Sequence, residues 1–351
     1  MYEYSHGGNA VFETGKKNMI DLSANINPFG MPDNIADAII GEIPNIIFYP
    51  DSFSSKLRES IGLFRNIDPD WIICGNGASD IIFRIPRAVQ AKKVLLCAPT
   101  FSDYERAARS FGSEVVLHGL SPANDFTLDR TCVSTVQREK PDLVFICNPN
   151  NPTGKLTDIG LIKELLEYCK QINAVVVIDE CFMDFVNRAD EYTSIRFLFN
   201  YPNLIILKAF TKMMGLPGIR LGYAICANKD LIDRLYFHGP DWSVSNLAQA
   251  AGLAAVAVEA AFIRQTVSYV SSQRAMVENG ISQLGYKIFS SEANYVFFQS
   301  PYPFDLREAL DEKGIRIRAC GNYHGLDASY YRIAVSTEEN NIKLLSALQE
   351  I

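Results

Sequence analysis

Several features are missing from this 351-residue sequence, and each absence excludes a class of protein. No segment is rich in lysine and arginine, and a formal net charge of -7 argues against a nucleic-acid scaffold. The longest apolar stretch, residues 250–262, contains Glu259 and is too short to span a bilayer. Residues 1–17 are polar and lack the apolar core of a signal peptide, so we expect a cytoplasmic protein without a membrane partner.

Patterns of disulfides and metal ligands are also missing. The eight cysteines include no CxxC pair, and several lie inside apolar runs, so we expect buried free thiols in a reducing compartment. The four histidines lack the spacing of metal ligands, and no structural zinc is expected. With 48% hydrophobic and 21% charged residues, the chain has the composition of a globular protein large enough for two domains.

Short apolar runs alternate with amphipathic segments through the middle of the chain. The runs predict strands at residues 93–98, 114–117, 143–147, 174–178, 204–207 and 221–225. The segments between them predict helices, among them residues 103–111, 158–172 and 230–237. Strands buried on both faces and joined by helices indicate an α/β fold with a mostly parallel sheet. In such a fold, functional groups collect at the carboxyl ends of the strands.

The C-terminal part has a different pattern. A long helical region is followed by short strands and a closing helix, at residues 247–284, 286–289, 295–298, 315–318, 331–335 and 340–350. This pattern indicates a smaller α+β domain. We therefore divide the chain into an N-terminal segment (1–30) that packs with the small domain and the active site, a large domain (31–246) and a small domain (247–351).

Two lysines and an arginine lie in the polar stretch between two of the apolar runs. Lys208 and Lys212 follow residues 204–207, and Arg220 precedes residues 221–225. A lysine beside a fixed arginine suits a phosphorylated aldehyde, because the amine forms an imine with the carbonyl and the guanidinium binds the phosphate. For this window alone, a surface lysine and a surface arginine are the alternative interpretation.

Four other segments supply further parts of such a site. GNGASD (75–80) places glycines and Ser79 before a helix pattern, where free backbone amides bind phosphate. NPNNPTG (148–154) is a rigid turn whose asparagine amides suit a phenolic oxygen, and VVVIDE (175–180) ends an apolar strand with a carboxylate suited to a protonated pyridine nitrogen. PTFSDY (99–104) offers aromatic rings for stacking, and we favour Tyr104 over Phe101. The alternatives are helix caps, a stiff turn and a core aromatic.

Taken in order, GNGASD, PTFSDY, NPNNPTG, VVVIDE and the TK of residues 211–212 followed by GIRLGY resemble the fold type I pyridoxal-phosphate enzymes. The similarity is strongest to the branch of histidinol-phosphate aminotransferases and threonine-phosphate decarboxylases, and it covers nearly the whole chain. It implies a mostly parallel central sheet in a large domain, a smaller α+β domain, and pyridoxal 5'-phosphate as the cofactor.

The resemblance also implies a role for each matching residue. Lys212 is the lysine that holds the cofactor as an imine, Asp179 pairs with the ring nitrogen, and Asn151 bonds the phenolic oxygen. The cofactor phosphate is expected to contact Ala78, Ser79, Thr211 and Arg220. Lys208 lies outside the matching position and is interpreted as structural.

A homodimer with composite active sites is a further implication, in which Tyr49 of FYPD (48–51) contacts the cofactor phosphate across the interface. The substrate is expected to be a small phosphorylated amino acid. Its predicted contacts are His6, Gly7, Asn25, Arg318 and Arg332. Arg332 lies in an alternating strand, so a solvent-facing strand residue is the alternative to a carboxylate clamp.

Several segments favour the decarboxylases of this branch. HGGN (6–9), SANINP (23–28) and residues 318–326 are similar to threonine-phosphate decarboxylases, although His324 stands where the family more often has proline. Phe182 occupies a position where many aminotransferases of the branch have tyrosine. The sequence therefore predicts decarboxylation of L-threonine O-3-phosphate to (R)-1-amino-2-propanol phosphate for cobalamin biosynthesis. A histidinol-phosphate-type aminotransferase, a serine-phosphate decarboxylase and a cofactor-binding regulator are the alternatives.

Overall fold

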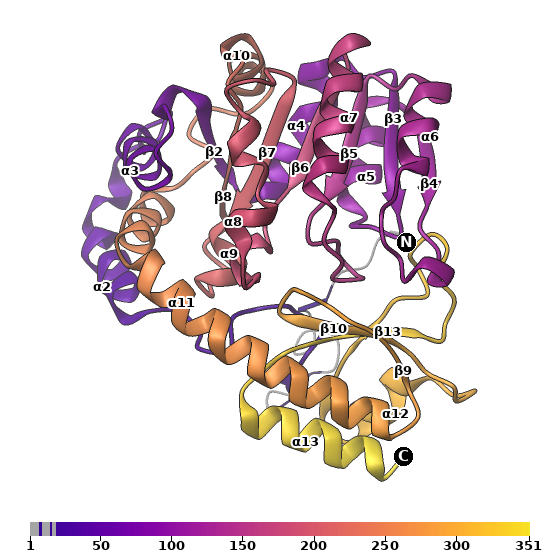
Figure 1. Cartoon of the computed structure of the whole chain (residues 1–351). Helices are drawn as coiled ribbons and strands as arrows, with labels where there is room; N and C mark the ends of the chain where they lie inside the picture. Colours follow the sequence, from indigo (N-terminus) through magenta and orange to yellow (C-terminus); the bar gives the residue numbers. More distant parts are fainter. Residues whose placement is uncertain (1–6, 9–14, 16–18) are drawn as a thin grey trace.

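The computed structural model describes residues 7, 8, 15 and 19–351, and it has a large sheet domain beside a smaller one (Figure 1). The large domain is built on a seven-stranded sheet in the order β2-β8-β7-β6-β5-β3-β4. Its strands are β2 (Ile72–Asn76), β8 (Leu221–Ile225), β7 (Leu204–Ala209), β6 (Val175–Asp179), β5 (Leu143–Cys147), β3 (Lys93–Ala98) and β4 (Glu114–Gly119). Strand β8 is antiparallel to both of its neighbours, and the other pairs are parallel.

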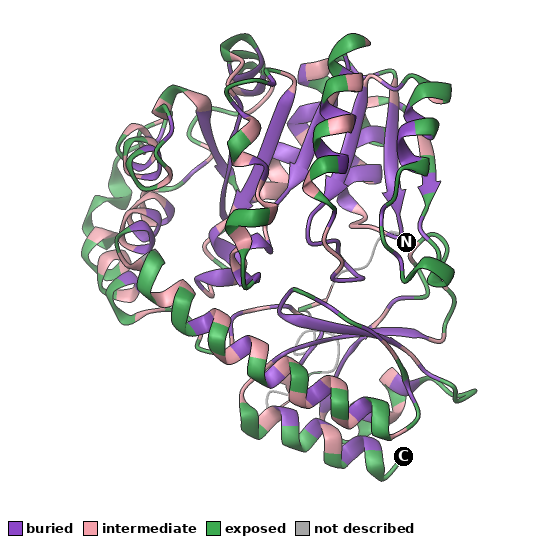
Figure 2. Cartoon of the chain, viewed as in Figure 1, coloured by how far each residue is buried: buried purple, intermediate pink, exposed green. Residues whose placement is uncertain are grey.

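The sheet is buried on both faces (Figure 2). Successive side chains of a strand point to opposite sides, so each strand contributes to an apolar cluster on each face. Along β5, Val144 and Ile146 join one apolar cluster, whereas Leu143 and Phe145 join another. Helices α4 (Ala78–Val89), α5 (Asp103–Phe111) and α10 (Lys229–Phe237) contribute to the second cluster, and α6 (Thr131–Glu139) and α7 (Ile159–Gln171) contribute to the first. The predicted α/β fold is confirmed.

The small domain contains a four-stranded antiparallel sheet in the order β12-β13-β10-β9. Its strands are β9 (Lys287–Phe289), β10 (Tyr295–Gln299), β12 (Arg318–Ala319) and β13 (Tyr330–Ala334). Helices α12 (Leu306–Glu312) and α13 (Glu338–Gln349) belong to it, and α11 (Asn246–Gln283) runs from the large domain along it (Figure 1).

Residues 20–30 of the N-terminal segment contact the small domain through a strand and the large domain at Lys212. Strand β1 (Ile20–Asp21) pairs in parallel with β11 (Ile315–Arg316). We predicted one strand over residues 315–318, but the structure divides it into β11 and β12, which lie in different sheets. The division lets this segment hold the N-terminal strand and still add an edge to β13.

Strand β2 was not predicted, because its glycine-containing end was interpreted only as a turn before a helix. It pairs with β8 through all five residues and places Gly75 and Asn76 directly before α4. Helices α2 (Asp33–Glu42) and α3 (Ser55–Arg65) pack against α11. Short helices complete the chain at α8 (Ala189–Tyr192), α9 (Phe210–Met213), η1 (Ile43–Ile47), η2 (Pro69–Trp71), η3 (Pro122–Asn124), η4 (Met183–Phe185) and η5 (Ser194–Phe197).

The described residues contain neither a single helix suited to cross a membrane nor a group of side chains suited to hold a metal ion. No single helix there is long and apolar enough to cross a membrane; the two parts of α11 on either side of a 75° bend pass that test only jointly, by length and composition. Over the same residues, no group of three histidine, cysteine, aspartate or glutamate side chains is arranged to hold a metal ion.

Candidate active site

Lys212 lies in α9, the short helix that begins directly after β7. The N-terminal segment fixes this turn from outside. The Asn27 backbone N–H donates to the Lys212 carbonyl at 3.1 Å, and its side-chain Nδ2 donates to the Met213 carbonyl at 2.7 Å. Gly215 has φ 63°, and a Cβ there would lie 2.6 Å from the carbonyl carbon of Gly30. The segment around residues 27–30 therefore packs too closely on the lysine turn for a larger residue at 215.

The electrostatic surroundings of Lys212 favour its neutral amine. Burial and, after it, the nearby charges of Arg332 and Arg220 lower the pKa of the ammonium group to about 8, against the opposing effects of Cys181 and Asp179. The Nζ atom lies 5.8 Å from the centre of the Phe182 ring. A neutral amine is the nucleophile that attacks a carbonyl, so the site prepares this lysine for an aldehyde.

Asp179 ends β6 with a buried carboxylate that already has two donors. The Tyr104 hydroxyl donates to Oδ2 at 2.6 Å, and the Cys181 backbone N–H donates to Oδ1 at 3.0 Å. Asp179 thus bonds the turn directly after β6, but it does not cap the next helix, which begins after Phe182, and it lines the cavity described below. Burial and the charge of Asp179 raise the pKa of Tyr104 well above its ordinary value, so Tyr104 stays a donor.

Tyr104 is fully buried, and one face of its ring stacks on Phe145 at 4.9 Å between centroids. Its hydroxyl is used by Asp179. Phe101 also lines the cavity, edge-on to Tyr104 at 5.6 Å. Stacking of Tyr104 on a cofactor ring stays a prediction, and Phe101 is equally placed on the cavity wall.

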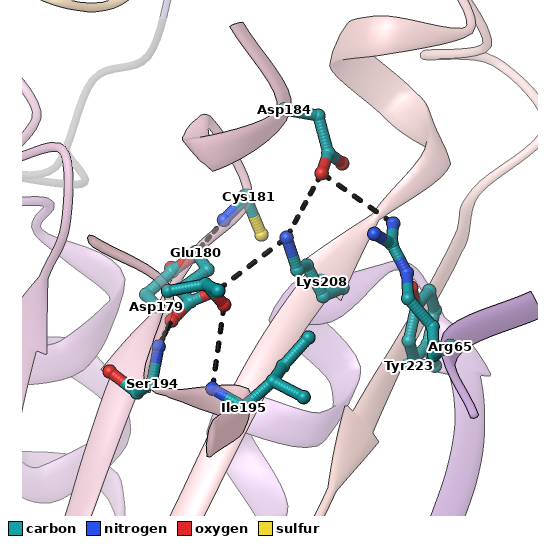
Figure 3. Close-up of polar contacts among 10 residues, drawn as sticks. Arg65, Asp179, Glu180, Cys181, Asp184, Ser194, Ile195, Lys208 and Tyr223 are labelled. Carbon is teal, nitrogen blue, oxygen red and sulfur yellow. Dashed lines mark hydrogen bonds and ion pairs between the residues drawn. The ribbon is translucent and has the colours of Figure 1, made fainter. Parts of the chain in front are cut away.

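Lys208, four residues before Lys212 in β7, belongs to a buried ionic cluster (Figure 3) and is not among the residues that line the cavity described below. Its Nζ lies 3.1 Å from Oδ1 of Asp184 and 3.5 Å from Oε2 of Glu180. Arg65 reaches the same Asp184 oxygen at 3.5 Å, and the Ser194 backbone N–H donates to Glu180 at 2.6 Å. The placement of Lys208 agrees with a structural role. Its partners were not predicted.

The start of α4 forms a compact corner whose free amides and nearby guanidinium suit an anion. Gly77, the residue before the helix, has φ 80°, and a Cβ on it would lie 2.5 Å from Nη2 of Arg220. Ala78 and Ser79 form the first turn, where helix amide N–H groups lack acceptors. Thr211 lines the same cavity as Ala78 and Arg220. The Ser79 hydroxyl lies 3.1 Å from Oδ2 of Asp103 and donates to it.

Asn151 and Arg332 meet at the opposite side of the site. The two middle asparagines of the NPNNPTG turn have different partners. Asn150 donates to the Pro99 carbonyl and to the Thr153 hydroxyl at 2.9 Å each, whereas Oδ1 of Asn151 accepts from Nη1 of Arg332. Nη2 of Arg332 donates to the Ser23 carbonyl at 2.8 Å. Strand β13 is buried on both faces, so the solvent-facing alternative for Arg332 is excluded.

Arg318 enters from the small domain beside Arg332. Its Nη2 donates to Oδ1 of Asn322 at 3.0 Å, and its guanidinium carbon lies 5.6 Å from the centre of the Tyr323 ring.

Asn25 is 2% exposed, and among the described residues no partner contacts its Oδ1. Gly8, next to Gly7, donates its backbone N–H to the Ser23 hydroxyl at 2.9 Å.

One cavity of about 310 Å³ brings most of the predicted residues together. From the prediction it is lined by Gly7, Asn25, Ala78, Ser79, Tyr104, Asn151, Asp179, Thr211, Lys212, Arg220, Arg318 and Arg332. Tyr49 does not line the cavity of its own chain; it is 79% exposed and stacks on Trp242 at 4.6 Å. His6 lies outside the described residues.

Besides Cys147, sequence reasoning missed four cavity residues with polar or aromatic side chains. They are Ser23, Asp103, Cys181 and Tyr323. Each stands within or beside a segment that we had singled out: SANINP, PTFSDY, VVVIDE and residues 318–326. The motif segments therefore indicated where the missed residues would be found. Which of their side chains turns inward depends on loop geometry that a sequence pattern does not supply.

The arrangement of charge fits pyridoxal 5'-phosphate. The α4 N-terminus and Arg220 suit a phosphate, the Lys212 amine suits an aldehyde, and the Asp179 carboxylate suits a protonated ring nitrogen. Two buried polar atoms on the cavity wall, Oδ1 of Asn25 and Nε of Arg332, have no protein partner among the described residues. Unsatisfied buried polar atoms are costly, and a polar ligand would supply the missing bonds.

Comparison with known proteins gives the same result. The profile of the family described as aminotransferase class I and II matches residues 17–348. The threonine-phosphate decarboxylase of Salmonella typhimurium is 30% identical, over 100% of this chain and 97% of its own length. The histidinol-phosphate aminotransferase of Bacillus subtilis is 34% identical, over 97% and 93%.

Among solved structures, the histidinol-phosphate aminotransferase of Clostridium acetobutylicum superposes with a TM-score of 0.88 at 29% identity, covering 95% of this chain and 98% of that one. Both enzyme types are thus about equally similar to this chain. The protein therefore belongs to the class I and II aminotransferase family of pyridoxal-phosphate enzymes, in the branch of threonine-phosphate decarboxylases and histidinol-phosphate aminotransferases.

Proposed function

We propose that the protein decarboxylates L-threonine O-3-phosphate to (R)-1-amino-2-propanol phosphate, a reaction that serves cobalamin biosynthesis. The observation that carries the proposal is the pair of arginines, Arg318 and Arg332, on the wall of one small cavity. A phosphorylated amino acid has two anionic groups, a carboxylate and a phosphate, and each suits one guanidinium. Histidinol phosphate has a phosphate and no carboxylate, so it uses one of the two charges.

The protein's part in such a reaction is to hold the substrate. When bound, the cofactor supplies an electron sink for the bond that breaks at the alpha carbon. The arginine that grips the carboxylate would orient the substrate against this electron sink, and it would thereby decide which bond at the alpha carbon is cleaved. Arg332 is fixed by Asn151 and by the Ser23 carbonyl, which makes it a rigid clamp.

Phe182 supports the same reaction. Its ring is buried, lies edge-on to Tyr295 at 5.1 Å, and lines the cavity next to Lys212. A phenylalanine donates no hydrogen bond to the cofactor's phenolic oxygen, which leaves Asn151 as the donor there.

Eight unpaired cysteines, seven of them buried, fit a reducing compartment such as the cytoplasm.

A histidinol-phosphate-type aminotransferase is the second candidate, because the Bacillus subtilis enzyme of that kind is 34% identical over 97% of this chain. The deciding experiment offers the cofactor-loaded protein threonine phosphate, serine phosphate or histidinol phosphate, each with and without 2-oxoglutarate. Carbon dioxide release that needs no keto acid supports the decarboxylase. Glutamate formation from histidinol phosphate without carbon dioxide release contradicts it. Threonine and serine phosphates differ by one methyl group, so a preference of roughly 10- to 200-fold is expected at most.

The two lysines of the turn give this experiment its controls. Lys212→Ala should bind the cofactor without a covalent link and lose at least about a thousandfold in rate. Lys208→Arg keeps the charge of the buried cluster and should retain the covalent link and most of the activity. Borohydride reduction followed by peptide mass measurement should find the cofactor on Lys212. Attachment to another lysine would contradict the assignment.

A further inference from the structure

Residues 318–326, the loop between β12 and β13 with Arg318 at its start, contact α5 of the large domain through a histidine. Nε2 of His324 lies 2.7 Å from Oε2 of Glu105, a carboxylate in the first turn of α5. Glu105 is 7% exposed, whereas the His324 side chain is 53% exposed. A buried carboxylate is thus met by a side chain that comes from the other domain.

The carboxylate is held in place before the loop reaches it. Nε of Arg109, one helical turn along α5, donates to Oε1 of Glu105 at 2.7 Å. Burial raises the pKa of Glu105, but the hydrogen bonds and charges of Arg109 and His324 outweigh it and lower the pKa below its ordinary value. Glu105 is therefore ionised and fixed, and it offers its second oxygen to the loop.

From His324 the connection continues into the cavity. Tyr323 and Asn322 directly precede His324, and both contact Arg318: Asn322 by the hydrogen bond at 3.0 Å, and Tyr323 under the guanidinium at 5.6 Å. Tyr323 lines the cofactor cavity. A second cavity, of about 350 Å³, lies on the other side of the same loop and includes Glu105, Arg109 and His324 in its wall. Residues of this loop thus line both cavities, and they contact Arg318, which lies in β12 just before the loop.

We propose that His324 is a positioning residue for substrate: through its bond to Glu105 it ties the loop to α5 and so holds Arg318 at the substrate end of the cavity. This inference rests on the proposed function only in taking a phosphorylated amino compound as the ligand. The tie acts on Arg318, whereas Lys212, Asp179 and the α4 N-terminus lie on other elements. Tyr104 precedes Glu105 on α5, so a substitution of His324, on the loop, is the one that leaves the α5 side of the cofactor cavity unaltered.

The test compares His324→Gln, Glu105→Gln and the double variant. KM for the phosphorylated amino compound should rise about three- to tenfold in each single variant, the range of a partly exposed charge-assisted bond, whereas kcat should change less than about twofold. Cofactor affinity should stay unchanged. The double variant should be no worse than either single one, because both remove the same bond. Arg109→Gln is the matched control: it removes the other partner of Glu105 and leaves the tie, so its KM should rise less.

A second measurement does not need turnover. Amide hydrogen exchange in residues 318–326 of the cofactor-loaded protein should be faster in His324→Gln and Glu105→Gln than in the unaltered protein, while exchange in β10 and β13 stays the same. If the unaltered protein turns over none of the substrates, the proposed function is wrong. The exchange measurement alone then tests whether the His324–Glu105 bond holds the loop. Unchanged loop exchange in both variants, or cofactor loss in parallel with the KM effect, would overturn the inference.

Discussion

At the scale of single residues, two lysines four positions apart have opposite chemical states. Lys212 faces the cavity, where burial and two arginines lower its pKa to about 8. Burial also lowers the pKa of Lys208, but Asp184 and Glu180 outweigh it and raise that pKa above its ordinary value. Lys208 therefore stays protonated and paired, which makes it a poor nucleophile. The turn thus offers an aldehyde one reactive amine although it contains two.

The state of Lys212 predicts how cofactor uptake depends on pH. The attacking form is the neutral amine, so the rate of covalent attachment to the cofactor-free protein should rise with pH and level off above about 8. Below that midpoint the rate should fall about tenfold per pH unit. Arg332→Gln removes a cation that depresses this pKa, so its midpoint should lie at higher pH. Stopped-flow absorbance measures both profiles. An unshifted midpoint in the variant would remove Arg332 as a cause.

At the scale of elements, the site depends on how tightly α4 and the turn before Arg220 approach each other. Gly77→Ala should lower affinity for pyridoxal phosphate by about 10- to 100-fold, because φ 80° is strained for alanine and the new Cβ would displace the Arg220 guanidinium. Titration with the cofactor measures the loss.

Gly112 supplies the control for this substitution. It ends α5 with φ 94°, and no atom lies within 4 Å of a Cβ built there. Gly112→Ala has the same backbone strain without the clash, so it should lower stability and leave cofactor affinity unchanged. Equal loss of affinity in both variants would mean that strain alone, and no contact with Arg220, explains the effect.

The ionic cluster of Lys208, Glu180, Asp184 and Arg65 joins four elements beneath the site: β7, the end of β6, η4 and α3. Lys208→Met leaves two buried carboxylates without their shared cation and should lower the free energy of unfolding by about 3–5 kcal/mol. Denaturant unfolding of the cofactor-free protein measures it. A loss below about 1 kcal/mol would show that water or Arg65 replaces the lysine.

The pH dependence of this effect has a definite sign. The raised pKa of Lys208 means that its contribution is present below its unfolded value and is lost only as pH rises through the folded one. Burial raises the pKa of Asp184, but Lys208 and Arg65 outweigh it and lower that pKa, so its contribution is lost only in acid. The difference between Lys208→Met and the unaltered protein should therefore be constant from about pH 5 to about pH 9.

Much of the architecture was predictable because its signals are local. The runs at residues 93–98, 143–147 and 221–225 became strands with those bounds, since strands buried on both faces are continuously apolar. Strand β2 was missed because its glycines resemble a turn, and β11 and β12 were merged because a break between two sheets leaves no local mark. The cluster of Lys208 and the tie of His324 join distant segments, and no periodicity reports such pairs.

At the scale of the whole molecule, one surface is unusually apolar. Around η1, five consecutive or near-consecutive large side chains are 49–79% exposed: Ile43, Ile46, Ile47, Phe48 and Tyr49. Trp242, 48% exposed, adds to it, because its ring packs in a tilted arrangement against Tyr49. Contiguous exposed apolar surface marks an interaction site. We propose that a second copy of the chain covers it and that Tyr49 reaches the partner's cofactor phosphate.

Ile47→Glu should therefore weaken self-association by at least about a hundredfold, because a charge would be buried in an apolar interface. Sedimentation velocity measures the change, and activity should fall with it if Tyr49 completes the partner's site. Ile342→Glu places the same charge on α13, where Ile342 is 50% exposed, and should leave association unchanged. A monomeric unaltered protein, or equal effects of both substitutions, would contradict a dimer through this surface.

The bond from Arg332 to Ser23 spans 309 positions of the chain. Translation proceeds from the N-terminus, so Ser23 has long emerged from the ribosome before Arg332 is made. The strands of the large domain can pair during synthesis, but the substrate clamp forms only when nearly all of the polypeptide has been released. A message cut short before residue 332 would thus yield a product that has Lys212 and the start of α4 yet lacks Arg332 and its bond to Ser23.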